Sequence, residues 1–280
     1  MPPAGVAIGC RGGVLPPSSV VRPRAPDPAQ PRTGPRSAAR RGAAGFLRPA
    51  PPDRLWRYRL AVMTYSGRVT VGGPADVHEL KDLMITKVAV GPMENNAYLL
   101  RCRATDEQLL IDAANDAGTL LGTIGHDGIA SVVTTHRHGD HWQALAEVVA
   151  ATGARTHAGR EDAEGIPVPT DVLVDDGDTV RVGQVELTAR HLVGHTPGSI
   201  ALVYDDPHGH PHVFTGDCLF PGGVGNTFKD PEAFARLIQD VETKIFDVLP
   251  DETWVYPGHG NDTTLGAERP RLPEWHARGW

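Results

Sequence analysis

Cysteine and long apolar runs are scarce in this sequence of 280 residues, and each scarcity excludes a class of protein. Its three cysteines, Cys10, Cys102 and Cys218, are too few and too scattered for a disulfide framework, which favours a reducing compartment such as the cytoplasm. No stretch approaches the roughly 18 consecutive apolar residues that a membrane-spanning helix needs. We therefore expect a cytoplasmic protein that has no membrane partner.

Lysine is scarce as well, and the charge is unevenly distributed. Only four lysines stand beside 23 arginines, and the net charge of the whole chain is -7. Residues 1–62 carry a net charge of +9, so residues 63–280 carry -16. Because the phosphates of nucleic acids attract lysine and arginine, the acidic charge of the larger part argues against a nucleic-acid partner.

Residues 1–62 differ in composition from the rest of the chain. They hold 12 of the 25 prolines and show no regular hydrophobic period. Such a segment buries too little apolar surface to offset the entropy lost on ordering. Its arginine-rich, acid-poor composition also resembles an organellar transit peptide, and Met63 would be a natural start codon. We predict that residues 1–62 are a disordered or untranslated extension and that residues 63–280 form the folded domain.

From residue 84 onward, apolar runs are separated by turn residues, which is typical of β-strands. We predict strands over 84–90, 97–102, 107–113, 130–136, 171–177, 178–190, 199–207, 212–220 and 252–258. Apolar periodicity and capping residues predict helices over 115–125, 140–153 and about 231–248, the last with Asp230 as N-cap and Pro231 at its first position. This order suggests two sheets sandwiched between helices.

The segment Thr-His-Arg-His-Gly-Asp-His at 135–141 lies between a predicted strand and a predicted helix. Alternate residues of an extended segment point the same way, so His136 and His138 can hold one metal ion together. Asp140 and His141 fall at the turn and the expected helix start, aimed at a second position. Imidazole and carboxylate groups suit Zn²⁺, and also iron or manganese.

Three more metal-capable side chains follow predicted strands and are flanked by glycine. His195 lies in the turn Val-Gly-His-Thr-Pro-Gly-Ser, Asp217 ends His-Val-Phe-Thr-Gly-Asp, and His259 ends Trp-Val-Tyr-Pro-Gly-His. Each alone would usually be a structural turn residue. Together with the 135–141 segment, they predict a metal site at the end of a strand-rich scaffold.

These motifs, in this order and spacing, resemble the metallo-β-lactamase superfamily, and within it the glyoxalase II-like (hydroxyacylglutathione hydrolase-like) hydrolases. The similarity covers roughly residues 84–266. It implies an αββα four-layer sandwich of the α/β (α+β) class, with two Zn²⁺ ions per chain at one edge of the sheets. By this resemblance His136, His138 and His195 hold one ion, Asp140, His141 and His259 hold the other, and Asp217 bridges them.

The implied chemistry is hydrolysis of a small-molecule thioester. Two cations hold a water and lower its pKa toward neutrality, which gives a hydroxide at pH 7. One ion polarises the substrate carbonyl and the other stabilises the departing thiolate. Asp140 and Asp217 are expected to be catalytic, because they can orient the hydroxide and handle its proton.

Two departures bear on the substrate. Only 21 residues follow His259, too few for the helical domain with which glyoxalase II binds glutathione, and Asn226 stands where that family often has a basic residue. A thioester of another thiol, such as mycothiol, is therefore at least as plausible. Lys229 could meet a substrate carboxylate, although a solvated surface lysine is the more usual interpretation.

Three alternatives stay open from the sequence. A persulfide dioxygenase of the same fold would use a single iron held by His136, His195 and Asp217. A lactonase or other ester hydrolase would share all the motifs. A structural zinc module predicts missing ligands, and none is missing here. The complete second ligand set favours the hydrolase, and the oligomeric state remains open.

Overall fold

Two β-sheets form the centre of residues 64–279, the part of the chain that the computed structural model describes. The first sheet runs in sequence order from β1 to β7, at Asp76–Glu79, Leu83–Val90, Asn95–Cys102, Gln108–Ile111, Ser131–Thr134, Arg155–Gly159 and Val172–Val174. The second sheet has the order β15-β14-β11-β10-β9-β8, at Thr263–Thr264, Trp254–Pro257, His212–Gly216, Ile200–Tyr204, Val185–His191 and Thr179–Val182. A small hairpin pairs β12 (Leu219–Phe220) with β13 (Gly223–Val224). The predicted extension at 1–62 lies outside the described residues, so the boundary at residue 63 stays a prediction.

Both sheets carry apolar side chains on both faces, because successive residues of a strand point to opposite sides. In β2, Leu83 and Ile85 belong to a buried cluster between the sheets, whereas Val88 and Val90 belong to a second cluster on the outer face. β10 divides in the same way, with Leu202 between the sheets and other residues in a third cluster outside. Both outer faces must therefore be covered.

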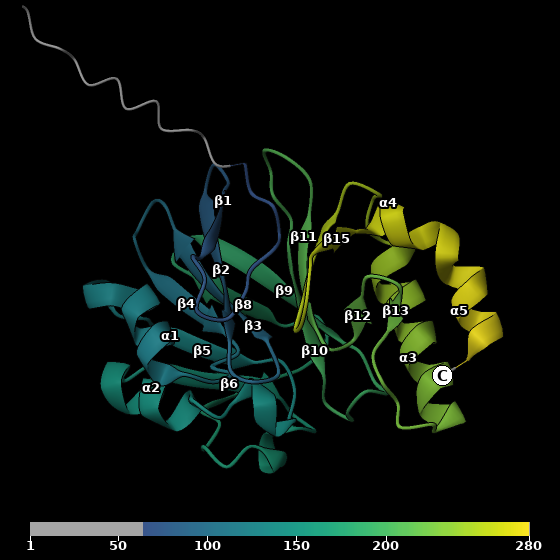
Figure 1. The fold of residues 1–280 in the computed structure, drawn as a ribbon, viewed down its shortest axis with the longest axis horizontal. Helices are drawn as coiled ribbons and strands as arrows, with labels where there is room; N and C mark the ends of the chain where they lie inside the picture. The colour runs from purple at the N-terminus through teal and green to yellow at the C-terminus, as the bar shows by residue number, and fades with distance from the viewer. Residues whose placement is uncertain (1–63, 280) are drawn as a thin grey trace, which may run out of the picture. The chain divides into compact units, whose positions relative to one another are not determined.

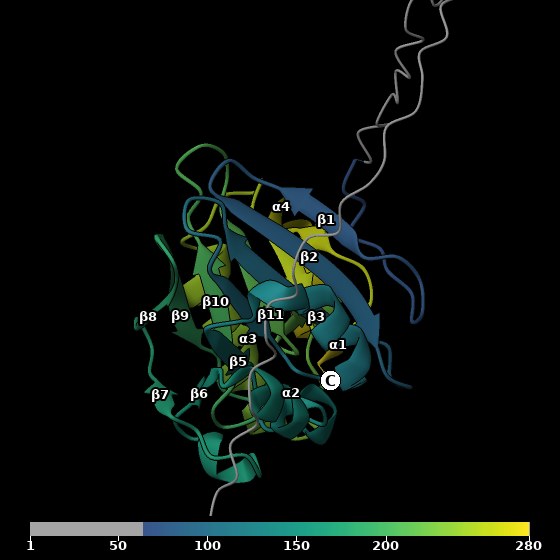
Figure 2. The same cartoon turned by 90° about the vertical axis from the view of Figure 1, so that its left-hand side faces the viewer.

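Helices cover the two outer faces. On the first sheet lie α1 (Ala117–Ile124) and α2 (Leu145–Thr152), and on the second lie α3 (Pro231–Val241), α4 (Leu265–Glu268) and α5 (Leu272–Arg278). Figures 1 and 2 show the layers, with α1 and α2 on one side of the sheets and α3 to α5 on the other. This is an αββα four-layer sandwich, so the predicted fold class is confirmed.

The helix predicted from residue 231 begins as expected. The carboxylate of Asp230 accepts hydrogen bonds from the backbone N–H groups of Glu232 and Ala233, and Pro231 occupies the first turn. A π-helical turn at Glu242–Phe246 continues α3, so the apolar face extends to Ile245. The capping residues of the sequence therefore predict the start of this helix better than its end.

Parallel pairing brings several strand ends to one edge of the sandwich. β4 and β5 are parallel neighbours in the first sheet, and β11 and β14 are parallel neighbours in the second. The sheets meet at this edge, where the backbone N–H of Asn96 donates to the carbonyl of Gly258 at 2.7 Å. Residues that follow these four strands therefore lie close together.

Some elements differ from the prediction. The polar strands β1 and β6, the short β15 and the helices α4 and α5 are not predicted. The second helix begins at Leu145 rather than at 140, and a 3₁₀ turn at Gly139–His141 precedes it. Strand β3 begins at Asn95 rather than at residue 97.

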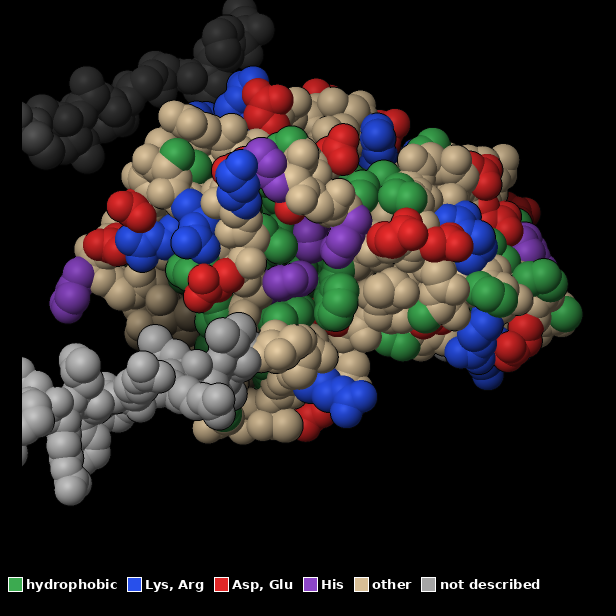
Figure 3. Space-filling model, turned by 90° about the horizontal axis from the view of Figure 1, so that it is seen from above, with side chains coloured by type: hydrophobic (Ala, Val, Ile, Leu, Met, Phe, Trp, Pro, Cys, Tyr) green, Lys and Arg blue, Asp and Glu red, His purple; other side chains and the backbone are tan. Residues whose placement is uncertain are grey.

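Within residues 64–279, no helix is long and apolar enough to cross a bilayer. On the face that Figure 3 shows, acidic and basic side chains are interspersed, and several histidine side chains lie near the middle. No single sign of charge dominates that face.

Candidate metal centre

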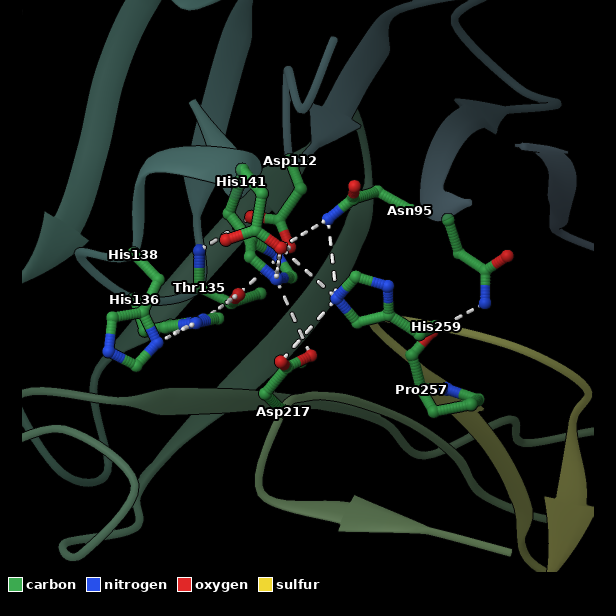
Figure 4. Close-up of polar contacts among 12 residues, drawn as sticks. Asn95, Asp112, Thr135, His136, His138, His141, Asp217, Pro257 and His259 are labelled. Atoms are coloured by element: carbon green, nitrogen blue, oxygen red, sulfur yellow. Dashed lines mark hydrogen bonds and ion pairs between the residues drawn. The ribbon is translucent and has the colours of Figure 1, made fainter. Parts of the chain in front are cut away.

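The structure brings all seven metal-capable side chains predicted from the sequence to one edge of the sandwich. Figure 4 shows how His136, His138, His141, Asp217 and His259 face one another. His136, His138, Asp140 and His141 lie in the connection from β5 to α2. The remaining three follow β9, β11 and β14 of the second sheet, and they are His195, Asp217 and His259. Both sheets therefore contribute to the cluster.

Three imidazole nitrogens converge in the first half of the cluster, here named the first triad: His136, His138 and His195. The Nδ1 atom of His138 lies 3.1 Å from His136 Nε2 and 2.9 Å from His195 Nε2, and the two Nε2 atoms are 3.3 Å apart. A single proton can form a hydrogen bond in only one of these three nitrogen pairs. Donors held about 2.0–2.1 Å from a tetrahedral cation lie about 3.3 Å apart, so the triad fits a metal ion.

The second half of the cluster combines oxygen and nitrogen, and is here named the second triad: Asp140, His141 and His259. The Oδ2 atom of Asp140 lies 3.5 Å from His141 Nε2 and 3.2 Å from His259 Nε2. All three donor atoms fall within 4.8 Å of one another. Mixed imidazole and carboxylate donors suit zinc, iron and manganese.

Asp217 lies between the two triads. Its Oδ1 atom is 3.4 Å from His141 Nε2, and its Oδ2 atom is 3.5 Å from His259 Nε2 and 3.7 Å from His195 Nε2. Asp217 Oδ1 and His141 Nε2 are buried and have no hydrogen-bond partner among the described residues. Because buried polar atoms are rarely left unpaired, this pair supports the fit of a cation between them.

Most of the histidines are oriented through their second ring nitrogen. Nδ1 of His141 contacts Asp112 Oδ2 at 2.8 Å, and Nδ1 of His136 contacts the hydroxyl of Thr135 at 3.1 Å. The other two partners are backbone carbonyls, that of Asn226 for His195 and that of Met93 for His259. Such contacts fix the tautomer, so that Nε2 carries the lone pair toward the cluster.

Asp112 supports residues of both triads through hydrogen bonds. Besides His141, its carboxylate accepts hydrogen bonds from the backbone N–H of Thr135 at 2.7 Å and from the Thr135 hydroxyl at 2.8 Å. It follows β4 in a left-handed conformation with φ of 58°. Asp112 thus contacts both His141 and the backbone next to His136.

The two triads differ in electrostatics. Burial lowers the pKa of all three histidines of the first triad, and for His136 and His138 neighbouring histidines lower it further. These rings are neutral near pH 7 and offer lone pairs. Burial would also lower the pKa of His141, but the negative charges of Asp112 and Asp217, together with the hydrogen bond to Asp112, raise it to about 10. A cation bound to the second triad would displace that proton.

Both carboxylates of the cluster are ionised at neutral pH. Contact with His259, whose Nε2 atom lies 3.2 Å from Oδ2, is the main cause that lowers the pKa of Asp140 far below its usual range. Burial would raise the pKa of Asp217, but the nearby His141, and to a lesser extent His259 and His195, lower it instead. Gly258 allows this approach, because a Cβ atom there would lie 2.2 Å from Asp217 Oδ1.

An open pocket of about 680 Å³ adjoins the first triad, lined by Asn226, Phe228, Lys229, Arg278 and Gly279. The ring of Phe228 is 65% exposed, and its centroid lies 5.7 Å from that of His138. Phe228 and Lys229 both have left-handed backbones, with φ of 56° and 64°. Such conformations are unfavourable for these residue types and often mark functional sites.

The sequence did not reveal every residue that contacts the site. Asn95 Nδ2 donates to Asp140 Oδ2 at 2.9 Å, and none of the motifs includes Asn95. No feature of the sequence distinguishes Thr135 as a residue that contacts the site. Cys218, which directly follows Asp217, is 1% exposed and packs in the outer cluster of the second sheet, so it is a core residue.

Comparison with known proteins bears directly on this cluster. The family model described as the metallo-beta-lactamase superfamily matches residues 90–259, which include all seven side chains. The curated hydroxyacylglutathione hydrolase of Fuscovulum blasticum is 35% identical over 170 residues, which make up 59% of this chain and 62% of that relative. The chain therefore matches less than two thirds of the length of this relative.

Two solved structures extend the comparison. TTHA1623, described in a di-iron-bound form, has 31% sequence identity and a TM-score of 0.54, with 65% of this chain and 96% of that chain covered. ETHE1 from Myxococcus xanthus has 28% identity and a TM-score of 0.60, with 68% and 83% covered. The matched region therefore has the same fold as these structures.

Proposed function

This chain belongs to the metallo-β-lactamase superfamily, and from that premise we propose that it is a metal-dependent hydrolase that cleaves a small-molecule thioester. The single observation that carries the proposal is the completeness of both triads with Asp217 between them. The curated hydroxyacylglutathione hydrolase supports the reaction class, since it is similar over the region that holds the cluster.

We propose one divalent cation in each triad, with Asp217 as their common ligand. Zinc is the expected metal, and iron or manganese also suit these donors. The relative described in a di-iron-bound form supports a pair of ions and makes iron a natural candidate. When bound, the cations supply a water acidic enough to serve as nucleophile near pH 7 and polarise the substrate carbonyl.

The chain's own residues then handle protons and position. Asp140 and Asp217, both ionised, are proposed to accept the proton of the attacking water and to return a proton to the departing thiolate. The side-chain amide of Asn95 donates a hydrogen bond to Asp140 Oδ2 and so positions this carboxylate. Because Asp217 is shared, a proton placed on it weakens both metal sites, so Asp140 is the better proton acceptor.

The alternatives make different demands on the cluster. A mono-iron persulfide dioxygenase would use His136, His195 and Asp217 and has no need of the second triad. The donors of the second triad converge within 4.8 Å, which supports the hydrolase. A lactonase would use the same residues, so only the substrate distinguishes it.

Metal analysis with a substrate panel on the purified full-length chain tests the proposal. We expect about two equivalents of zinc, or of zinc and iron, together with hydrolysis of acyl-thiol esters. His138→Ala should then lose both metal and rate, because Nδ1 is central to the first triad. One equivalent of iron with oxygen uptake on a persulfide, and no thioester turnover, would move the protein to the dioxygenase class.

The pocket beside Phe228 is proposed to bind the thiol part of the substrate, which can be a thiol other than glutathione, such as mycothiol. Lys229 and Arg278 line this pocket, and within residues 64–279 neither forms an ion pair with a carboxylate, although Arg278 donates to the carbonyl of Gly222. Since residues 63–280 carry a net charge of -16, two cations at the pocket give it a local charge that attracts an anion. This favours a thiol that carries an anionic group.

Replacing both cations by alanine tests that preference. Lys229→Ala with Arg278→Ala is expected to reduce kcat/KM about fivefold for a thioester of an anionic thiol such as glutathione, mainly through KM, since two exposed charge contacts contribute about 1 kcal/mol together. The thioester of the same acid with neutral N-acetylcysteamine serves as control and should be unaffected. An equal loss on both substrates would contradict charge recognition.

The remaining proposals concern the surroundings of the protein. Its few cysteines support a location in the cytoplasm. A small-molecule substrate, without a nucleic-acid or membrane partner, is in keeping with the acidic charge of residues 63–280.

A further inference from the structure

Asp162 is a buried carboxylate that none of the motifs singles out. It follows β6 and precedes a 3₁₀ turn at Ala163–Gly165, and it is 0% exposed. A carboxylate with no access to water must find its hydrogen-bond donors inside the protein. The donors that it finds belong to the two segments that carry the first triad.

The first contact is to the segment between His136 and His138. The backbone N–H of Arg137 donates to Asp162 Oδ2 at 3.0 Å, and the Arg137 guanidinium lies 3.7 Å from Oδ1. Because Arg137 is flanked on both sides by ligand histidines, this hydrogen bond holds the backbone from which both side chains project.

The second contact is to the segment directly after His195. The hydroxyl of Thr196 donates to Asp162 Oδ2 at 2.5 Å, and the backbone N–H of Gly198 donates to Oδ1 at 2.9 Å. A single carboxylate thus joins the two loops that together supply all three nitrogens of the first triad.

The two loops pack closely around the Asp162 carboxylate. A Cβ atom on Gly198 would lie 2.3 Å from the backbone nitrogen of Asp162, and one on Gly159 would lie 2.0 Å from the carbonyl oxygen of Gly198. There is no room for a larger residue at either glycine. Together with the hydrogen bond from the backbone N–H of Ile200 to the carbonyl of Thr135 at 2.9 Å, the contacts of Asp162 therefore hold the segment after His195 against the 136–138 segment.

We propose that Asp162 is a positioning residue that holds His136, His138 and His195 at the spacing required by the first cation. The inference rests on the proposed function only in that the first triad binds a metal ion. Its hydrogen bonds in the described part of the chain run to Arg137, Thr196 and Gly198, whereas the second triad is held by Asp112 and Asn95. Loss of Asp162 should therefore weaken the first site and spare the second.

Asp162→Asn is the informative change, because asparagine keeps the shape but offers one acceptor oxygen to several donors. Zinc affinity is measured by competition with a chromophoric chelator in two backgrounds of the full-length chain. His259→Ala impairs the second site and leaves the first to report, and His138→Ala does the reverse. We expect Asp162→Asn to weaken zinc binding about 10–100-fold in the first background and to leave it unchanged in the second.

Two further variants separate positioning from folding. Asp206→Asn is the matched control: Asp206 is also buried and accepts a backbone hydrogen bond, from His208, in the connection between β10 and β11. It should change zinc affinity in neither background. Thr196→Val removes one donor to Asp162 with little change in volume, and should weaken only the first site, by less than Asp162→Asn. It provides the measurement if Asp162→Asn does not fold.

Zinc affinity that is unchanged in the His259→Ala background, or lowered equally in both backgrounds, would overturn the inference. Because binding is measured without substrate, the result is independent of the reaction. A protein that binds two zinc ions but hydrolyses no thioester would refute the proposed function and leave the role of Asp162 intact.

Discussion

Asp217→Ala is expected to lower the metal content from about two equivalents to one or fewer and to lower kcat/KM about a thousandfold or more. Asp217 reaches both triads, with carboxylate oxygens 3.4 Å from His141 Nε2 and 3.7 Å from His195 Nε2. Its removal takes a negatively charged ligand from both ions at once. Loss of metal-ion stabilisation is worth several kcal/mol in the transition state, and about 4 kcal/mol corresponds to a thousandfold.

Metal analysis and steady-state kinetics on one preparation check this result. Asp205→Ala is a suitable control, because Asp205 is exposed and follows β10, at the end of that strand away from the cluster. It should retain the metal and the rate of the parent chain. Two tightly bound ions with undiminished turnover in Asp217→Ala would contradict the proposed role of Asp217 as a ligand shared by both ions.

Lys87→Met is expected to cost about 3–5 kcal/mol in the free energy of unfolding, the usual result of breaking a buried ion pair from one side. The Lys87 side chain is 0% exposed and that of Asp262 is 1% exposed, and their charged atoms lie 2.5 Å apart. The ammonium also donates to the carbonyls of Gly67 and Gly260, at 2.9 and 2.8 Å. Methionine would leave Asp262 buried without a countercharge.

The pH dependence of urea unfolding gives this prediction its sign. Burial already raises the pKa of Asp262 in the parent chain, and loss of the lysine would raise it further. A carboxyl group with a raised folded-state pKa binds its proton more tightly in the folded state, so stability falls as pH rises toward neutrality. The deficit of Lys87→Met should therefore shrink as the pH is lowered from about 7 to about 5.

Two comparisons make the result specific. Lys81→Met changes an exposed lysine and should stay within about 0.5 kcal/mol of the parent. Adding Asp262→Asn to Lys87→Met should restore part of the loss, because a neutral amide is easier to bury than an unpaired carboxylate. A deficit that is the same at both pH values would mean that lost packing, rather than an unpaired charge, is the cause.

The sequence predicts the layers and the site residues for two physical reasons. Strands buried on both faces, such as β2 and β10, are largely apolar runs, and they can be recognised without any tertiary information. Metal-capable residues next to glycine at the ends of such runs are readable too, which is why His195, Asp217 and His259 could be named. The structure places these residues where the prediction expected them, and their role as ligands remains a proposal.

The remainder depends on contacts between distant segments. Strands β1 and β6 are short and polar, so no hydrophobic period marks them. Nothing in the sequence distinguishes Lys87 from a surface lysine. Its side chain points between the sheets because alternate residues of β2 face that way, and its partner Asp262 lies 175 residues further along the chain. Asp162 is likewise defined by loops that meet only in the folded protein. Sequence periodicity carries no information about such partners.

The division of the seven donors between two sheets has a mechanical consequence. The 136–141 segment is attached to the first sheet, and Asp217 and His259 are attached to the second. A bound cation would therefore act as a removable cross-link across the sandwich, closing long loops of chain as a disulfide does elsewhere. This chain, with its three scattered cysteines, would thus gain from metal coordination the stabilising cross-link that small extracellular proteins gain from disulfide bonds.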